Sequence, residues 1–220
     1  MFAYEATLRL DNPLSFRTNE FGNVIRMSKI LHNWALMFAM NGIRGNPEKN
    51  HLTNLKGCNV YCTPALPLKA DFQFQTFHPF PEAPQLITHP ESRPLETIKA
   101  YQSSFTILQY KEFALPGSTF RFAVASKIAL PNEMVITYGG KQTLQRVFLK
   151  EADFVIVDDF RGDVRHPFNA LDFNGQKMRM INSIKYSMPP SPLFEGTITE
   201  PVDAALVKSG SEQYLVPQTW

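Results

Sequence analysis

The chain has 220 residues, and its 22 Lys and Arg against 20 Asp and Glu give a net charge of +2 at neutral pH. So small a net charge excludes a protein whose whole surface attracts nucleic acid, so any such contact must be local. The 17 prolines are too many for a largely helical chain, and with 18 phenylalanines they favour a strand-rich, loop-rich protein that buries a sizeable core.

The two cysteines, Cys58 and Cys62, have no second pair, so neither a zinc ribbon nor a disulfide framework is predicted. Their spacing places both on one face of a strand, where burial is commoner than metal binding. The first residues lack the basic and apolar regions of a signal peptide, and no window reaches the roughly 20 apolar residues that span a membrane. We therefore expect a soluble cytoplasmic protein without a cofactor and without membrane contact.

The N-terminal segment predicts a strand followed by a helix. Apolar residues alternate with others over the first ten positions, at Phe2, Tyr4, Ala6, Leu8 and Leu10. Between Asn23 and Met40 they recur every three or four residues, which predicts one long helix that ends near Asn41 and Gly42. Residues 43–57 contain Gly and Pro and are predicted to form a loop.

The middle of the chain predicts a strand over residues 71–77 and then an excursion from the core. Alternation places Phe72 and Phe74 toward the core. Phe77 and Phe80 have a better chance of projecting outward, although packing is the favoured interpretation for them too. Five prolines between positions 79 and 94 interrupt regular structure, so we expect residues 78–100 to leave the core.

Strands are predicted to resume at residues 101–110, 118–130, 134–138 and 154–160, and the last twenty residues contain only short strand-like pieces. One helix in a chain dominated by strands fits an α+β fold with helices on one face of a mainly antiparallel sheet. A ferredoxin-like, RNA-recognition-type core is one such fold. We expect a single domain over residues 1–220, with an inserted thumb at 78–100 and a β-rich C-terminal extension.

Few residues have the spacing of a catalytic or metal site. His32 lies on the predicted helix beside Asn33, where a general base or an RNA contact is possible, although a structural histidine is the favoured interpretation. Asp158 and Asp159 follow an apolar run, and an ordinary polar strand end is favoured there over a metal site.

The run YGGKQTLQR places Gly139 and Gly140 after a strand and before Lys141 and Arg146. Two glycines let backbone N–H groups approach a phosphate closely, and the basic side chains beyond them supply positive charge. A tight hairpin turn explains the same two glycines without any ligand. Further basic residues after position 120 include Lys127, with acidic residues interleaved from Glu151 onward.

Three segments together resemble the Cas-five family of CRISPR-associated proteins in its subtype I-D form, also called Csc-one. They are LDNPLSFRTNEFGNVIRMSKILHNWALMFAM, then VYCTPALPLK, then FRFAVASKIALP with VITYGGKQTLQRVFL and HPFNALDF. The resemblance implies a protein of the RAMP superfamily, with a ferredoxin-like domain, an inserted thumb and a small second β region. It also implies a non-catalytic role in antiviral defence, in which the protein caps the 5′ handle of the guide RNA (crRNA) in a type I-D surveillance complex.

The partners implied are the crRNA 5′ handle, the first Cas-seven-type backbone subunit, the large subunit and target DNA near its flanking motif. The predicted handle-binding surface comprises Arg17, His32, Asn33, Lys127, Gly139, Gly140, Lys141 and Arg146. Two alternatives remain open. One is a metal-independent endoribonuclease that uses His32 or His166 as base with Lys141 for charge stabilisation. The other is a scaffold that contacts only neighbouring proteins.

Overall fold

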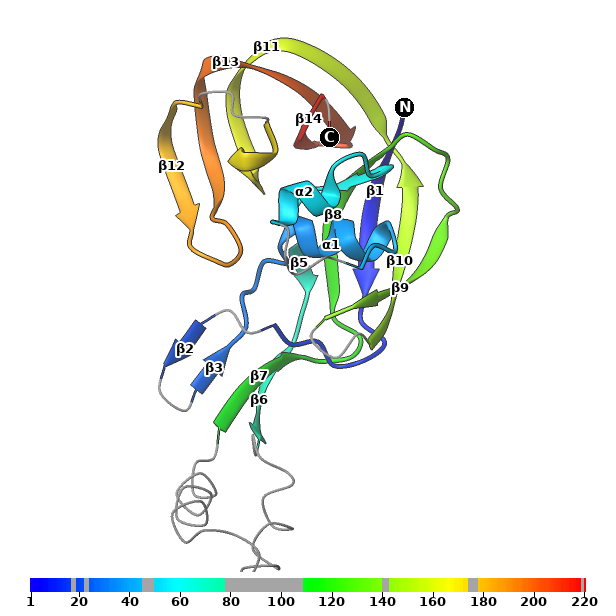
Figure 1. The fold of residues 1–220 in the computed structure, drawn as a ribbon, viewed down its shortest axis with the longest axis vertical. Coiled ribbons are helices and arrows are strands. Elements are labelled where there is room, and N and C mark those ends of the chain that lie inside the picture. The colour runs from blue at the N-terminus through cyan, green and yellow to red at the C-terminus, as the bar shows by residue number, and fades with distance from the viewer. Residues whose placement is uncertain are drawn as a thin grey trace, which may run out of the picture.

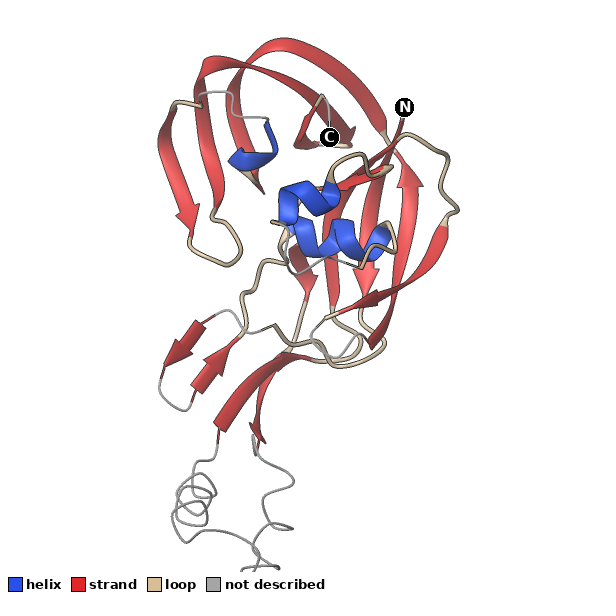
Figure 2. Cartoon of the chain, in the orientation of Figure 1, coloured by secondary structure: helices blue, strands red, loops and turns tan. Residues whose placement is uncertain are grey.

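The computed structural model describes residues 1–16, 19–21, 24–44, 50–77, 109–139, 143–173, 178–218 and 220. This part of the chain is mostly antiparallel sheet with few helices (Figure 2). The prediction of a strand-dominated α+β protein with a mainly antiparallel sheet is therefore confirmed. The thumb predicted at residues 78–100 lies outside the described residues.

The central sheet has the strand order β4-β8-β1-β10-β9, and β5 pairs with the far part of β8. All of its pairings are antiparallel. Its strands are β1 (Phe2–Arg9), β4 (Val60–Cys62), β5 (Leu66–Lys69), β8 (Thr119–Ser126), β9 (Glu133–Tyr138) and β10 (Thr143–Glu151). β1 lies between β8 and β10, so Tyr4, Ala6 and Leu8 reach the main core, as the sequence predicted. Phe2, at the start of the strand, is 44% exposed, and its predicted burial is wrong.

Two helices, α1 (Asn33–Met40) and α2 (His51–Leu55), lie together beside this sheet (Figure 1). α1 buries Trp34, Leu36 and Met37 in the main core. It ends at Asn41, whose amide donates to the Met37 and Val60 carbonyls and accepts from the Val60 N–H, which fastens the helix to β4. The predicted end of the helix is confirmed.

The predicted start of the helix at Asn23 is wrong. Residues Val24–Arg26 instead form strand β3, which pairs with β2 (Asn19–Phe21) and, in parallel, with β7 (Gln109–Ala114). Leu31 is buried through a bridge to Ala65 rather than by a helix face. The apolar residues that recur every three or four positions between Asn23 and Met40 therefore belong partly to a strand and a buried loop, and not to one long helix. The loop predicted at 43–57 likewise contains α2, which Asn50 caps by accepting from the Thr53 N–H.

A second sheet forms an arch over one end of the molecule (Figure 1). Its strands are β11 (Asp153–Phe168), β12 (Met180–Tyr186), β13 (Leu193–Ser209) and β14 (Glu212–Pro217), and a short 3-10 helix, η2 (Ala170–Phe173), follows β11. β13 has 17 residues and β14 has six, so the prediction of only short strand-like pieces near the end of the chain is wrong. This sheet encloses a second, smaller core around Val164, Phe168 and Phe173.

A third sheet projects from the opposite end as a stem, with the order β2-β3-β7-β6 (Figure 1). β6 (Phe72–Phe77) and β7 pair from Phe72 with Ala114 to Phe77 with Gln109. The predicted strand at 71–77 is confirmed. Its predicted faces are partly wrong, because Phe74 is 42% exposed. Phe80 lies outside the described residues.

Candidate nucleic-acid interface

The glycine turn joins β9 to β10 as a hairpin in which Tyr138 pairs with Thr143. Gly139 has a φ of +94°, a conformation that L side chains rarely adopt. A Cβ atom at this position would lie 2.5 Å from Cδ1 of Leu14, so the buried Leu14 side chain would have to shift to accommodate any side chain here. Gly140 and Lys141, predicted to complete this turn, lie outside the described residues.

A groove of about 470 Å³ adjoins the turn, between the end of α1 and β9. Among the described residues its wall combines aromatic rings, backbone and the Arg44 cation, and the lining includes Phe16, Phe38, Gly42, Arg44, Thr137, Tyr138 and Gly139. Phe16 and Tyr138 pack edge to face with ring centroids 5.0 Å apart. The buried Tyr138 hydroxyl has no hydrogen-bond partner within the described ranges. Arg17, which follows Phe16 and was predicted to bind RNA, is not among the described residues.

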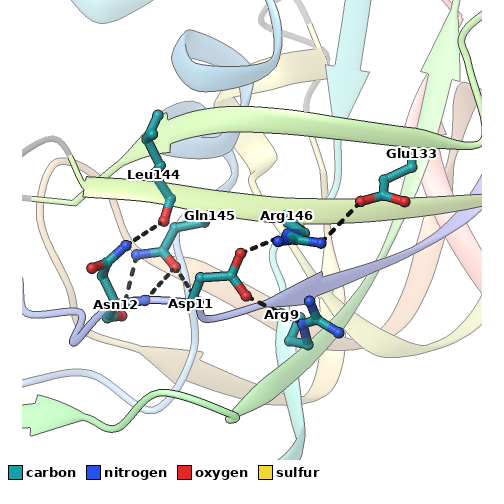
Figure 3. Close-up of polar contacts among 7 residues, drawn as sticks. All are labelled: Arg9, Asp11, Asn12, Glu133, Leu144, Gln145 and Arg146. Atoms are coloured by element: carbon teal, nitrogen blue, oxygen red, sulfur yellow. Dashed lines mark hydrogen bonds and ion pairs between the residues drawn. The ribbon is translucent and has the colours of Figure 1, made fainter.

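Arg146 lies on β10 near the same end of the central sheet and takes part in a network of surface charges (Figure 3). Its Nε is 2.8 Å from Oδ2 of Asp11, and its Nη1 is 3.5 Å from Oε1 of Glu133. Arg9 contacts the other oxygen of Asp11 at 3.3 Å. Such exposed pairs contribute about 0–1 kcal/mol each, so a phosphate can replace a carboxylate at low cost.

Gln145 holds the chain after β1 against this hairpin. Its Oε1 accepts from the backbone N–H groups of Asp11 and Asn12 at 2.8 and 3.3 Å, and its Nε2 donates to the Asn12 carbonyl (Figure 3). The Asn12 amide donates in turn to the Leu144 carbonyl. These contacts place Asp11 within reach of Arg146 and fix the loop beside the glycine turn.

Lys127 lies at the opposite end of the central sheet from the glycine turn. Phe2 at the start of β1 pairs with Ser126, whereas Arg9 at its end pairs with Arg146. The Lys127 ammonium donates to the backbone carbonyls of Cys58 and Trp220 at 3.2 and 3.0 Å. The fold therefore separates Lys127 from Gly139 and Arg146.

His32 and Asn33 are buried at the start of α1, with exposed fractions of 5% and 0%. Nδ1 of His32 accepts from the Trp34 N–H and caps the helix, and its Nε2 lies 3.1 Å from the carbonyl of Ser191, in the loop between β12 and β13. The ring is therefore neutral, with its proton on Nε2. Burial lowers the pKa of His32 to about 4. Both side chains hold the fold together, as the structural interpretation of His32 expected.

Asp172 of η2 is the centre of a buried polar cluster that joins the arched sheet to α1 and β4. Its carboxylate accepts hydrogen bonds from Nδ2 of Asn33 and Nε1 of Trp34, both at 2.6 Å, and from the Tyr61 hydroxyl at 2.8 Å. Burial raises the pKa of Asp172 to about 6, and the three donors oppose that shift. Nothing in the sequence around Asp172 signalled this role, because its partners lie more than 100 residues away.

His166 makes a third polar link between the arched sheet and the central core. Its Nε2 is 2.6 Å from the Pro64 carbonyl and 3.3 Å from the Thr63 hydroxyl. Burial lowers the pKa of this imidazole to about 4. Cys58 and Cys62 are both free and buried, as their spacing predicted.

The stem carries basic and aromatic side chains that sequence reasoning did not select. Cations lie over aromatic rings in three pairs, which are Arg26 over Phe74 at 5.9 Å, Lys29 over Phe72 at 3.4 Å and Lys111 over Phe113 at 5.6 Å. Tyr110 is 43% exposed on the same sheet. Alternating cations and rings are what single-stranded nucleic acid contacts through phosphates and stacked bases. The sequence signal for this surface was the row of polar residues along β6. The sequence prediction instead placed Phe74 of this strand toward the core.

Within the described residues, no group of three His, Cys, Asp or Glu side chains has the arrangement of a metal site. No helix in the same residues has the length and apolar character needed to cross a membrane.

The sequence matches a model of a CRISPR-associated protein family over residues 1–218. That family is the type I-D CRISPR-associated protein Cas5/Csc1, and the chain belongs to it. The resemblance found in the sequence is thereby confirmed.

Two solved structures of the type III-B Cmr-beta complex contain chains with distant similarity. In the complex bound to cognate target RNA and AMPPnP, one chain is 13% identical with a TM-score of 0.40, and the alignment covers 89% of this chain and 86% of that chain. In the complex bound to cognate target RNA, one chain is 12% identical with a TM-score of 0.32, and the alignment covers 93% of this chain and 86% of that chain. A search of curated proteins gives no significant match.

Proposed function

We propose that this protein is a non-catalytic subunit of a type I-D CRISPR surveillance complex and that it binds and caps the 5′ handle of the crRNA. Membership of the Cas5/Csc1 family supports the setting. The observation that carries the RNA-binding part is the groove beside the Gly139 turn, where Phe16, Phe38 and Arg44 meet a glycine backbone. Rings stack on splayed bases, while an arginine and a backbone free of Cβ atoms approach phosphates.

In this proposal the handle runs from the groove across the end of the central sheet. Arg146 exchanges its contact with Asp11 for a phosphate. Arg17, Gly140 and Lys141 lie outside the described residues and remain proposed RNA contacts on the sequence prediction alone. The stem continues the surface with Arg26 and its neighbouring rings. The thumb predicted at 78–100, which lies outside the described residues, is proposed to wedge between nucleotides. His32 and Asn33 are omitted because both are buried, and Lys127 because it lies at the far end of the sheet.

We also propose that the central sheet is a ferredoxin-like sheet with an altered second half. The order β4-β8-β1-β10, with α1 between β1 and β4, supports this interpretation. In place of a second helix between β8 and β10, the chain forms strand β9. The proposed protein partners are the Cas-seven-type backbone subunit and the large subunit, and the complex reads target DNA near its flanking motif.

The endoribonuclease alternative requires an accessible base. Nε2 of His32 contacts the Ser191 carbonyl and Nε2 of His166 contacts the Pro64 carbonyl, both inside the protein. Burial lowers the pKa of each ring to about 4 and disfavours the cationic form that a general acid needs. These contacts disfavour His32 and His166 as the base of an endoribonuclease.

The experiment is a titration of the purified protein, together with its backbone partner, against labelled repeat-derived RNA with and without the 5′ handle. Binding and strand cleavage are followed in the same samples. We expect intact RNA to bind through the handle, and Arg44→Ala combined with Arg146→Ala to weaken binding and lower the salt slope by about 0.7 per lost phosphate contact. Arg161→Ala combined with Arg165→Ala, which removes two exposed arginines of the arched sheet, is the matched control.

Each other outcome contradicts a different part of the proposal. Cleaved RNA would support the endoribonuclease. Equal binding of both RNAs at every salt concentration, with assembly that needs no RNA, would support the scaffold. An equal loss in the control and the double variant would show that only net charge matters.

A further inference from the structure

A second pocket lies on the other side of α1, between α1, α2 and η2, and has a volume of about 580 Å³. Both tryptophans of the chain, Trp34 and Trp220, line it together with Tyr61. Tyr61 and Trp220 have ring centroids 5.7 Å apart. The rim carries Leu52 and Leu171, which are 41% and 52% exposed. The pocket is thus an aromatic recess surrounded by exposed apolar side chains.

Asp172 also lines this pocket, and its charge is not balanced. Its three hydrogen-bond donors, Asn33, Trp34 and Tyr61, are all neutral. Over the described ranges, no lysine or arginine forms an ion pair with it. Oδ1 accepts one hydrogen bond and Oδ2 accepts two, so Oδ1 retains acceptor capacity. A desolvated carboxylate without a cation is costly, and an external cation would offset that cost.

We propose that this pocket binds an arginine side chain of a partner protein. A guanidinium is planar, stacks on tryptophan and tyrosine faces, and donates to a carboxylate. Lys127 already lies over the Trp220 ring at 5.3 Å, although its ammonium is occupied by two backbone carbonyls. The exposed leucines provide the apolar ring that surrounds an anchoring arginine in protein interfaces. A nucleic acid suits the pocket less well, because the carboxylate repels phosphate.

The location separates this site from the proposed RNA surface. The RNA groove is lined by Ala35, Phe38 and Ala39 of α1, whereas this pocket is lined by Trp34 and Met37. Among the described residues the two pockets share no lining residue, so we expect that both can be occupied at once. The arginine site therefore stands even if the RNA-handle proposal fails.

The test uses the full chain labelled with ¹⁵N, whose two indole N–H signals both report on this pocket. The probes are N-acetyl-arginine methylamide and the uncharged N-acetyl-citrulline methylamide. We expect the arginine probe to shift both indole signals in a saturable way and the citrulline probe to bind at least about tenfold more weakly, because it lacks the charge.

Two variants make the result specific to the pocket. Asp172→Asn keeps an acceptor but removes the charge, and it should weaken binding of the arginine probe by about tenfold or more. Lys56 lies on the pocket wall, so Lys56→Glu should strengthen binding several-fold even if the first variant does not fold. Lys69→Glu, an exposed lysine outside the lining, has the same change in net charge and should have no effect.

Five results would overturn the proposal. They are the absence of saturable shifts, equal binding of arginine and citrulline probes, and weaker arginine binding in Lys56→Glu. The fourth is a saturable response to adenosine monophosphate instead, which would assign the pocket to a nucleotide. Indole shifts that depend on protein concentration alone would show that a second copy of the chain occupies it and would also reject an arginine partner.

Discussion

Replacing Asp172 by alanine removes the carboxylate at the junction of α1, β4 and η2. The donors of Asn33, Trp34 and Tyr61 would then be buried without an acceptor. Each unsatisfied donor costs about 1–3 kcal/mol, which sums to about 3–9 kcal/mol. The substitution also removes a buried charge whose pKa is raised from 3.8 to about 6. That shift corresponds to about 3 kcal/mol of destabilisation above pH 6. Subtracting it leaves a net loss near pH 7.5 of about 0–6 kcal/mol, centred on about 3 kcal/mol.

The raised pKa of Asp172 also determines how the loss of unfolding free energy in Asp172→Ala changes with pH. Because the folded-state pKa of Asp172 is raised, its contribution to stability is fully present below 3.8 and is lost as pH rises through about 6. The substitution should therefore cost about 1 kcal/mol more at pH 5 than at pH 7.5. The contributions of His32 and His166 are common to both proteins and cancel in this difference.

Urea unfolding followed by circular dichroism measures both quantities by linear extrapolation. Asp153→Ala, at the exposed start of β11, is the matched control and should change the unfolding free energy by less than about 0.5 kcal/mol. A gain in unfolding free energy for Asp172→Ala at pH 7.5, or a smaller loss at pH 5 than at pH 7.5, would refute this account of the cluster.

Three further predictions concern the same core. The lowered pKa values of His32 and His166 mean that the free energy of unfolding falls as pH decreases from about 6.5 toward 4, by up to about 3 kcal/mol for each imidazole, which urea titrations at stepped pH would detect. Gly139→Ala should lower stability by about 1–3 kcal/mol in thermal melts, and more than Gly117→Ala, because both glycines have positive φ but only Gly139 is tightly crowded. Burial raises the pKa of the Cys62 thiol well above its usual value, so a thiol reagent at pH 8 should modify Cys62 only at the rate of protein opening; fast modification of folded protein would contradict its burial.

Sequence patterns succeeded where neighbours along the chain decide the structure. The alternation over residues 2–10 predicted β1, and the Asn41–Gly42 pair predicted where α1 ends. The family resemblance was also established from local motifs. Each of these signals depends on side-chain period, backbone conformation or residue identity within a few positions.

Only the tertiary structure decided which face each residue presents and which distant residues meet. Residues 24–26 became β3 because β7, more than 80 positions later, offers a parallel partner. Phe74 is exposed because its strand belongs to the projecting stem rather than to the central sheet. Asn33 is buried because η2 brings a carboxylate from position 172 to it. Strand partners and buried polar contacts depend on chain segments far apart in sequence, and their free energies arise only when the whole fold assembles.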